Sequence, residues 1–482
     1  MSIDLEQAEG TVTETDIVDA PADAPEAIPV RDEEGRIDAA FLQKVEDAIE
    51  AGDETAVREL AGDLHEADLG DLLEALGEND RPRLVQLLGG DFDFAALTEL
   101  DEAVRVKLID QLPAEDVAEG IGELDSDDAV YILEDLEPEE QAAILNQLSF
   151  SDRIQLQRSL DYPEESAGRL MQTDFIAVPP FWTVGQTIDH LREDHDLPDT
   201  FYEIYVVDPA FRLLGAVALD KLLRTKRSRK IAKIMTEERQ AVAATEDREE
   251  VARLFERYNL VSAAVVDEGE RLVGVLTIDD IVDVIQEEAE EDLRALAGVG
   301  DEEISDTVMV IARSRLTWLI VNLATAVLAS VVISLFENTI EAMVALAVLM
   351  PIVASMGGNA GTQTMTVAVR AIATQELGSR NFWRVLRREV LVAILNGVAL
   401  ALLMGLVAGV WFANPGLGLV IGTAIIVNQL FAGLAGLMIP IILERLEVDP
   451  AIASSVFVTT VTDVVGFFAF LGIAALWFGL PF

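Results

Sequence analysis

Apolar residues are distributed very unevenly along this chain of 482 residues. The last third contains long runs in which formal charges are absent or, in one case, limited to a single residue. These runs are 316–336, 342–369, 390–443 and 450–482. A helix needs about 20 apolar residues to cross a bilayer, and the third run is long enough for two such helices. Because "ANPGLG" at 413–418 interrupts that run, the pattern predicts a membrane domain of five helices over residues 313–482.

Between residues 64 and 160 a different pattern dominates, because a leucine recurs at every twelfth position. The leucines are Leu64, Leu76, Leu88, Leu100, Leu112, Leu124, Leu136, Leu148 and Leu160. Twelve residues accommodate a helix of roughly two to three turns and a corner. The spacing therefore predicts an all-α domain over 39–161, built as a superhelix of short helices. The preceding segment, 1–38, is acidic and predicts a disordered tail.

A second repeat follows with an offset of 59 residues. The stretch "IYVVDPAFRLLGAVALDKLL" at 204–223 matches "AAVVDEGERLVGVLTIDDIV" at 263–282. Each copy alternates in a way that predicts two strands joined by a turn and followed by a helix. Residues 162–285 are therefore expected to form an α/β module with an internal duplication.

This duplicated module resembles a tandem pair of CBS domains, a family that often binds adenosine nucleotides. In that family a Thr or Ser and an Asp three residues later hold the ribose. The second copy has Thr277 and Asp280 at these places, whereas the first has Ala218 and Lys221. The resemblance implies one candidate site for ATP or another adenosine nucleotide. A regulatory or metal-linked module without nucleotide is the alternative.

The segment "DDIVDVIQEEAEEDLRALAGVG" at 279–300 predicts one long acidic helix, which leads to a connecting or plug helix over 286–312. Among the carboxylates that crowd it are Asp280, Asp283, Glu287, Glu288, Glu291 and Asp292. Like charges three or four residues apart on a helix repel one another. A cation that screens them could therefore change the angle at which the soluble module joins the membrane domain, although such a run is usually only a solvated face.

Charge differs sharply between the two parts of the chain. Residues 1–300 hold 74 acidic and 26 basic residues, and residues 301–482 hold 12 and 8. The strongly acidic composition of residues 1–300 excludes nucleic-acid binding, which needs a basic surface. Such a composition is typical of proteins from a salt-rich cytosol. The chain lacks cysteine and has three histidines, which do not form a zinc motif. The arginines flanking the runs fall on one side, so the positive-inside rule places the N-terminal domains in the cytoplasm and the C-terminus outside.

One carboxylate, Asp463, lies deep inside a predicted span, and such residues commonly mark ion or proton pathways. Thr459 and Ser455 precede it at helical spacing and extend a polar face. A face of small residues that only packs helices is the alternative for Ser455.

The second span carries its own polar positions. Asn359, Gln363 and Thr366 follow one another at helical spacing, and Gly357, Gly358 and Gly361 lie in the same stretch. On the glycines alone, a helix-packing face would be favoured. Together with the Asp463 face, a hydrophilic pathway explains the pattern better. All of these ligands are hard oxygens, which suit Mg²⁺, Ca²⁺ or Mn²⁺. Hydrated Mg²⁺ held by two Asp463 side chains at a dimer axis fits best.

The motifs "GGNAGTQ" at 357–363, "DPA" at 449–451 and "TTVTDVVGF" at 459–467, together with the domain order, make the chain similar to MgtE magnesium transporters. The resemblance implies a homodimer whose pore is formed by spans two and five around Asp463. It further implies that cytosolic Mg²⁺ closes this pore by binding to carboxylates. The candidate sensor residues are Asp280, Asp283, Glu288, Glu291, Asp292, Asp127 and Asp128. The chain reads Ser454-Ser455-Val456 where the family usually has Ser-Gly-Pro.

The expected function is therefore Mg²⁺ permeation across the cell membrane, gated by internal Mg²⁺ and not enzymatic. The chain has no Walker A lysine loop for an ATP-driven pump. Permeation or exchange of Co²⁺, Mn²⁺ or Ca²⁺ is one alternative. A CBS membrane sensor that does not transport ions is another, although a simple anchor would need neither polar face.

Overall fold

The computed structural model describes residues 29–481 except 195–196, 199, 238–240, 298, 300–307, 379–380, 447 and 449. Residues 1–28 of the predicted tail and Asp449 of the "DPA" motif lie outside the described residues. The chain forms two compact units. One comprises the chain up to Leu124 together with Ile132–Ser149, and the other comprises Asp125–Tyr131 together with Phe150–Phe482.

From Ala39 onward the regular structure of the first unit is helical, as the leucine spacing predicts. Its helices are α1 (Ala39–Ala51), α2 (Glu54–Ala61), α3 (Glu66–Ala75), α4 (Arg81–Leu88), α5 (Glu102–Ile109), α6 (Ala114–Ile121) and α8 (Pro138–Leu145), with short 3-10 turns η1 (Gly89–Asp91) and η2 (Phe94–Leu97). Leu76 directly follows α3 and Leu88 ends α4, and both are buried. The repeated leucine is thus buried where one short helix ends and the connection to the next begins. Its period of twelve residues therefore equals the length of one helix plus one connection.

Residues at the end of the predicted tail belong structurally to this helical unit. Arg31 pairs across a short bridge with Ile37. Its guanidinium also contacts the carboxylates of Asp68 and Asp71 on α3, each at 2.6 Å.

A buried ion pair ties several corners of the helical unit together. The guanidinium of Arg105 on α5 donates to the Oδ2 atom of Asp135 at 2.9 Å. It also donates to the carbonyl oxygens of Leu97 at 3.2 Å and Leu100 at 3.1 Å. Because Arg105 is 2% exposed, these acceptors replace the water that its charge would otherwise require.

The duplicated α/β module in the second unit confirms the 59-residue repeat. Its elements are α10 (Ala167–Leu170), β1 (Ala177–Val178), α11 (Val184–Glu193), β2 (Glu203–Val207), β3 (Leu213–Ala218), α12 (Leu219–Leu223), η3 (Ile231–Lys233), β4 (Ala241–Ala243), α13 (Arg248–Tyr258), β5 (Ser262–Val266) and β6 (Leu272–Thr277). Among the described residues these strands make two three-stranded sheets, ordered β1-β2-β3 and β4-β5-β6. In each, the first pairing is parallel and the second antiparallel.

The register of the two sheets repeats as well. Val206 pairs with Gly215 in the first sheet, and Val265 pairs with Gly274 in the second. Both glycines are required by a close approach: a Cβ atom on Gly215 would lie 2.6 Å from the Thr236 carbonyl oxygen. On Gly274 it would lie 2.6 Å from a methionine sulfur. Each copy therefore needs glycine at this position so that a neighbouring segment can pack on the strand.

Two further helices of the second unit, α7 (Ser126–Glu134) and α9 (Phe150–Leu160), precede the module. Of α7, only the part up to Tyr131 belongs to this unit. The predicted acidic helix, α14 (Ile278–Ala297), follows β6 without a break. The Ser126 hydroxyl accepts a hydrogen bond from the backbone N–H of Thr173 at 2.7 Å, which fixes the start of α7 against the module.

The membrane domain contains five helices that are long and apolar enough to span a bilayer within the described residues, as the sequence predicts. They are α15 (Val308–Ser334), α17 (Ala345–Ala373), α18 (Phe382–Trp411), α19 (Pro415–Arg445) and α20 (Pro450–Phe478), with the short α16 (Glu337–Ala342) between the first two. The predicted break between α18 and α19 falls at Ala413, whose φ of 51° is left-handed. Asn414 then caps α19 by accepting the N–H of Leu417 at 3.3 Å.

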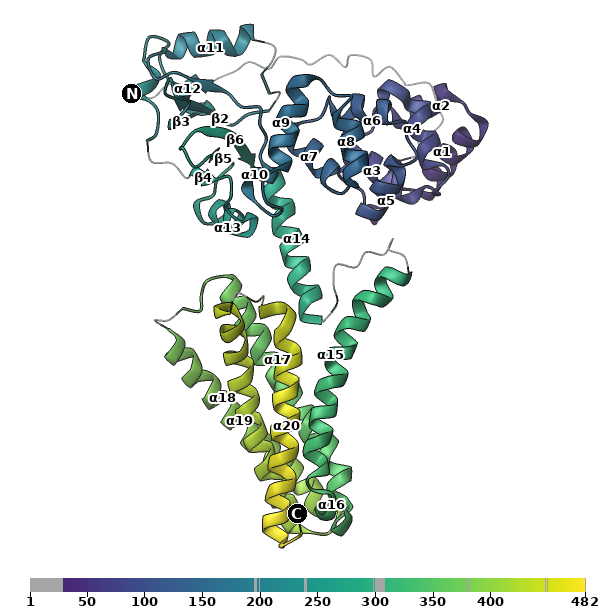
Figure 1. The fold of residues 1–482 in the computed structure, drawn as a ribbon, viewed down its shortest axis with the longest axis vertical. Helices are drawn as coiled ribbons and strands as arrows, with labels where there is room; N and C mark the ends of the chain where they lie inside the picture. The colour runs from purple at the N-terminus through teal and green to yellow at the C-terminus, as the bar shows by residue number, and fades with distance from the viewer. Residues whose placement is uncertain are drawn as a thin grey trace, which may run out of the picture. The chain divides into compact units, whose positions relative to one another are not determined.

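Helices α17, α19 and α20 form the core of this domain. Leu349, Ile421 and Phe470, one from each helix, are fully buried in a shared apolar cluster. Half of the most apolar stretch of α19 is buried, compared with 6% for α15. Figure 1 shows α15 and α18 diverging from the other helices at the ends opposite α16. The three core helices therefore carry the positions where polar side chains can meet.

Replacing Arg105 by methionine should destabilise the helical unit, because Asp135 would keep its charge without its buried partner. We expect a loss of roughly 3 to 5 kcal/mol in the free energy of local unfolding. Hydrogen exchange of the α5 and α8 amides in the full-length protein measures it. The matched control is Arg58→Met, which removes an exposed pair with Asp91 and should change stability by less than about 1 kcal/mol. Equal exchange in both variants would contradict the prediction.

Candidate ion pathway and cation-sensing site

The carboxylate of Asp463 lies midway along α20 and is half-buried. Within the part of the chain that the structure describes, it makes no hydrogen bond or ion pair. The neighbouring Thr459 hydroxyl is exposed and donates to the Ser455 carbonyl oxygen of its own helix at 2.8 Å. Ser455 is itself half-buried. The described part of the chain thus leaves the Asp463 carboxylate available to a ligand.

Helix α17 has two distinct faces. Asn359, Gln363 and Thr366 are exposed, so this polar stripe does not pack inside the chain. The Thr366 hydroxyl donates to the Thr362 carbonyl oxygen at 3.0 Å, which satisfies it within the helix. Within the described residues the amide groups of Asn359 and Gln363 are exposed to water or a cation.

The glycines of "GGNAGTQ" lie mostly on the opposite face. Gly357 and Gly361 are buried. A Cβ atom on Gly361 would lie 2.5 Å from the Val458 side chain of α20, and one on Gly436 of α19 would lie 2.5 Å from the Gly361 carbonyl oxygen. Gly358 is half-buried with open space beside it. Gly357 and Gly361 let three helices approach closely within the chain, and their part in a pathway stays a prediction.

Two further amides lie in the centre of the membrane domain and were not singled out from the sequence. Asn428 and Gln429 on α19 are 1% and 4% exposed. Both donate to backbone carbonyls of α17, Asn428 to Val353 at 2.9 Å and Gln429 to Met356 at 3.3 Å. The available signal was the pair "NQ" inside an uncharged run of apolar residues, where an amide must find an internal partner.

The sensor candidates Asp127, Asp128 and Asp280 come together at the start of α14. Burial, and then the charge of Asp280, raises the pKa of Asp127 well above its usual value. The buried Oδ1 atom of Asp127 has no hydrogen-bond partner among the described residues. Burial also raises the pKa of Asp280 to about 7, although the Thr277 hydroxyl, which donates to it at 2.5 Å, opposes this rise. Crowded carboxylates of this kind favour a proton or a cation between them.

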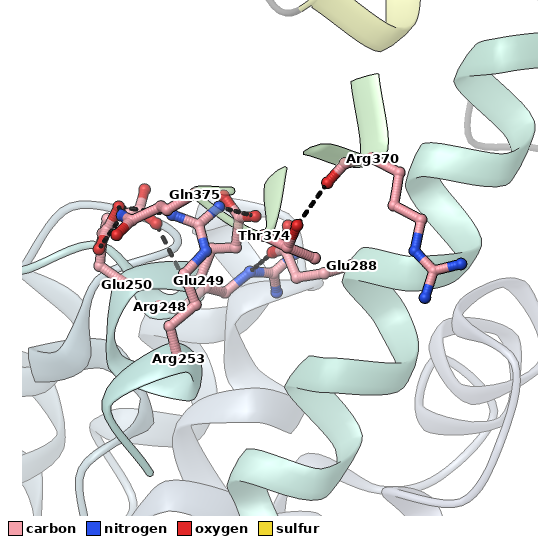
Figure 2. Close-up of polar contacts among 9 residues, drawn as sticks. Arg248, Glu249, Glu250, Arg253, Glu288, Arg370, Thr374 and Gln375 are labelled. Carbon is pink, nitrogen blue, oxygen red and sulfur yellow. Dashed lines mark hydrogen bonds and ion pairs between the residues drawn. The ribbon is translucent and has the colours of Figure 1, made fainter. Parts of the chain in front are cut away.

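Further along α14, an arginine of a neighbouring helix neutralises part of the acidic face. Arg248, the first residue of α13, donates from Nε to Glu288 at 2.8 Å and from Nη1 to Glu287 at 3.0 Å. Figure 2 shows the Arg248–Glu288 contact beside Arg253. Burial raises the pKa of Glu288 to about 7, and the positive charge of Arg248 opposes that rise. Arg248 was missed in the sequence because 40 residues separate it from Glu288.

The remaining candidates on α14 are spread along the helix. Burial and then the charge of Asp279 raise the pKa of Asp283. The charge of Glu291 contributes to the raised pKa of Glu288, so these two carboxylates interact. Asp292 acts in the same way on Glu249 of α13, whose pKa is raised mainly by burial. Among the described residues, no three acidic or histidine side chains form a preassembled metal site.

The same part of α13 also reaches the end of α17. Gln375, in the loop that follows α17, donates from Nε2 to the two carboxylate oxygens of Glu250 at 3.3 and 3.5 Å (Figure 2). Its φ of 54° is left-handed, a conformation that few residues other than glycine adopt. Helix α13 therefore contacts both the acidic helix α14 and the loop beyond a core membrane helix.

The α/β module contains two hollows related by its repeat. The one beside Thr277 is small, about 20 Å³, and is also lined by Tyr205 and Ser262. The one beside Ala218 is a cleft of about 1020 Å³, lined also by Glu203 and Tyr258. Of the two residues predicted to hold a ribose, Thr277 lines the smaller hollow, and its hydroxyl donates to Asp280.

Comparisons with known proteins identify three segments of the chain. Residues 350–473 match a family described as divalent cation transporter, residues 64–165 match the MgtE intracellular N domain, and residues 231–287 match the CBS domain. The chain is 27% identical to the soluble part of a magnesium transporter, covering 52% of this chain and 98% of that one, with a TM-score of 0.46. It is 31% identical to the cytosolic domain of the Mg²⁺ channel MgtE in complex with ATP, covering 50% and 99%, with a TM-score of 0.48.

Curated relatives match over most of their length. The magnesium transporter MgtE of Bacillus subtilis is 35% identical over 65% of this chain and 70% of the relative. The corresponding proteins of Enterococcus faecalis and Thermus thermophilus are 36% and 37% identical, again over 70% of each relative. With the helical domain, the duplicated α/β module and five spanning helices in the expected order, the chain belongs to the MgtE family.

Proposed function

We propose that the chain is a homodimeric, channel-like Mg²⁺ transporter of the cell membrane whose pathway runs along α17 and α20. The observation that carries the proposal is the half-buried Asp463 carboxylate, which has no partner in the described part of the protomer. A charge at this depth is costly unless a cation or water accompanies it. Two symmetry-related copies would present two carboxylates, which suits a Mg²⁺ ion that keeps its water shell.

The polar surface of α17 supports the same pathway. Asn359, Gln363 and Thr366 are exposed in a helix whose other face packs into the protein. Exposed amides facing hydrocarbon would be unfavourable, so a second copy of the chain and a hydrated path between the copies account for them. A sensor that did not transport ions would need neither these amides nor Asp463.

Gating by cytosolic Mg²⁺ is the second part of the proposal. Asp127, Asp128 and Asp280 crowd together, and their repulsion favours a cation between them. Mg²⁺ bound there would hold the start of α14 against α7, while Arg248 holds its later turns against α13. The contact between Gln375 and Glu250 then links α13 to the end of α17. The N-terminal domains lie in the cytoplasm and the C-terminus outside, as the arginine distribution favours.

The CBS module adds a candidate ligand. An adenosine nucleotide such as ATP would bind through its ribose to Thr277 and Asp280, in competition with the hydrogen bond between them. Binding there would alter the same carboxylate that is proposed to sense Mg²⁺, so nucleotide would shift the Mg²⁺ concentration at which the pathway closes.

Replacing Asp463 by asparagine should reduce Mg²⁺ uptake into proteoliposomes to background, because the neutral amide cannot offset the charge of the ion. Glu341→Gln, on the exposed α16, is the matched control and should keep normal uptake. Parallel uptake of Co²⁺, Mn²⁺ and Ca²⁺ measures selectivity. Uptake by Asp463→Asn equal to that of the unaltered protein would refute the pathway, and no flux from the unaltered protein would favour a sensor.

Millimolar Mg²⁺ should protect α14 from limited proteolysis, because a bound cation removes repulsion between its first turn and α7. In Asp280→Asn this protection should weaken, whereas Glu256→Gln on the exposed face of α13 should respond as the unaltered protein does. Fragment patterns at increasing Mg²⁺ concentrations provide the measurement. Identical cleavage with and without Mg²⁺ would contradict a cation-linked junction.

The apparent Mg²⁺ affinity of this site should fall as the pH is lowered from 8 to 6, because protons compete for Asp280, whose pKa is about 7. Without Mg²⁺, lowering the pH should instead stabilise the folded state around Asp280. A carboxyl whose pKa is raised by folding contributes stability that is fully present below its unfolded pKa and is lost as the pH rises to its folded pKa. Without Mg²⁺, hydrogen-exchange protection of 278–284 should therefore increase on acidification. Asp280→Asn should flatten both pH profiles, and unchanged profiles in that variant would assign the titration to another group.

A further inference from the structure

Asn428 occupies a slot between three membrane helices. It lies on α19, and a Cβ atom added to Gly357 of α17 would come within 2.1 Å of its Nδ2 atom. One added to Gly466 of α20 would come within 2.7 Å of the same atom. The amide therefore fits only because both neighbouring helices carry glycine at the point of contact.

The orientation of the amide is determined by its neighbour. Its Nδ2 atom lies 2.9 Å from the carbonyl oxygen of Val353. The reverse orientation would place two oxygens against each other, so the amino group must point to α17. Val353 follows Pro351, which has no N–H and interrupts the hydrogen-bond ladder of α17. Asn428 thus donates its hydrogen bond to α17 close to the turn in which Pro351 removes a backbone hydrogen bond.

The carbonyl oxygen of the Asn428 side chain does not contribute to the stability of the fold. The Oδ1 atom of Asn428 is buried and has no hydrogen-bond partner within the described residues. A buried acceptor without a donor is unfavourable, and more so in a bilayer. Leucine has a similar shape and would fill the slot without that penalty. A residue present only to pack these helices would therefore be apolar.

The position of the slot links it to the proposed pathway. Gly466 is three residues beyond Asp463 on α20, and Gly357 is two residues before Asn359 on α17. We propose that Asn428 is a positioning residue for ion permeation, which sets the amide stripe of α17 against the carboxylate of α20 through Val353 and the two glycines. This inference rests on the proposed pathway between those helices.

The first test replaces Asn428 by leucine in the full-length protein and measures thermal unfolding and Mg²⁺ flux together. The unfolding temperature should stay equal or rise, because an unsatisfied acceptor is removed. Mg²⁺ flux should fall by roughly three- to tenfold, and the ratio of Mg²⁺ to Mn²⁺ flux should change. Thr423→Val removes a polar group from the exposed face of the same helix and should change none of these quantities.

A second pair of variants leaves Asn428 in place and disturbs the slot instead. Gly466→Ala would push against the amide, whereas Gly472→Ala on the same helix meets its nearest neighbouring atom at 3.8 Å. Only Gly466→Ala should lower the flux and alter the ion ratio. This pair decides the question if Asn428→Leu does not fold.

The outcomes separate this inference from the proposed function. If Asp463→Asn abolishes flux while Asn428→Leu and Gly466→Ala keep normal flux and ion ratio, the positioning role is wrong and the pathway stands. A fall in flux that follows a fall in unfolding temperature, with an unchanged ion ratio, would make Asn428 a packing residue only. If the unaltered protein carries no Mg²⁺ at all, the proposed function itself fails.

Discussion

The cost of placing polar groups in hydrocarbon governs the membrane domain of this protein. An amide or carboxylate in a bilayer must be satisfied by protein, by water or by an ion. Thr459 and Thr366 meet this requirement inside their own helices by donating to backbone carbonyls. Asn428 and Gln429 meet it in part by donating to α17. Asp463 does not meet it within the described residues, and this unmet requirement connects the fold to the proposed movement of ions.

Charge repulsion imposes the corresponding constraint on the soluble part. With a formal net charge of −52 over the whole chain, carboxylates that must be buried need cations close by. Arg105 supplies one to Asp135, and Arg248 supplies one to Glu287 and Glu288. At Asp127 and Asp280 the neighbouring charges are carboxylates instead, and these charges add to the rise in pKa that burial causes. The carboxylates of α14 thus differ in their neighbours: Glu287 and Glu288 have an arginine, whereas Asp280 has a hydroxyl and other carboxylates.

Glycine allows neighbouring segments to approach closely both in the α/β module and in the membrane domain. Gly215 and Gly274 let a neighbouring segment approach a strand, and Gly357 and Gly466 let an amide enter between two helices. In each pair a methyl group would occupy space already filled. The glycine-rich stretch of α17 is therefore a packing surface on one face, while the opposite face carries the exposed amides that the proposed pathway needs.

The sequence by itself determined the elements whose signals are local and periodic. The uncharged runs specified five spans, the twelve-residue leucine spacing specified short helices, and the 59-residue repeat specified paired strands with the same register. Asp463 could be recognised because a carboxylate in an apolar run is conspicuous. Only the tertiary structure decided that Arg248 meets Glu288, that Gly357 faces Asn428, and that Asp280 lies close enough to Asp127 to raise the pKa of Asp127. These contacts join residues far apart in the chain, and helical spacing specifies which residues share a face but not which element that face meets.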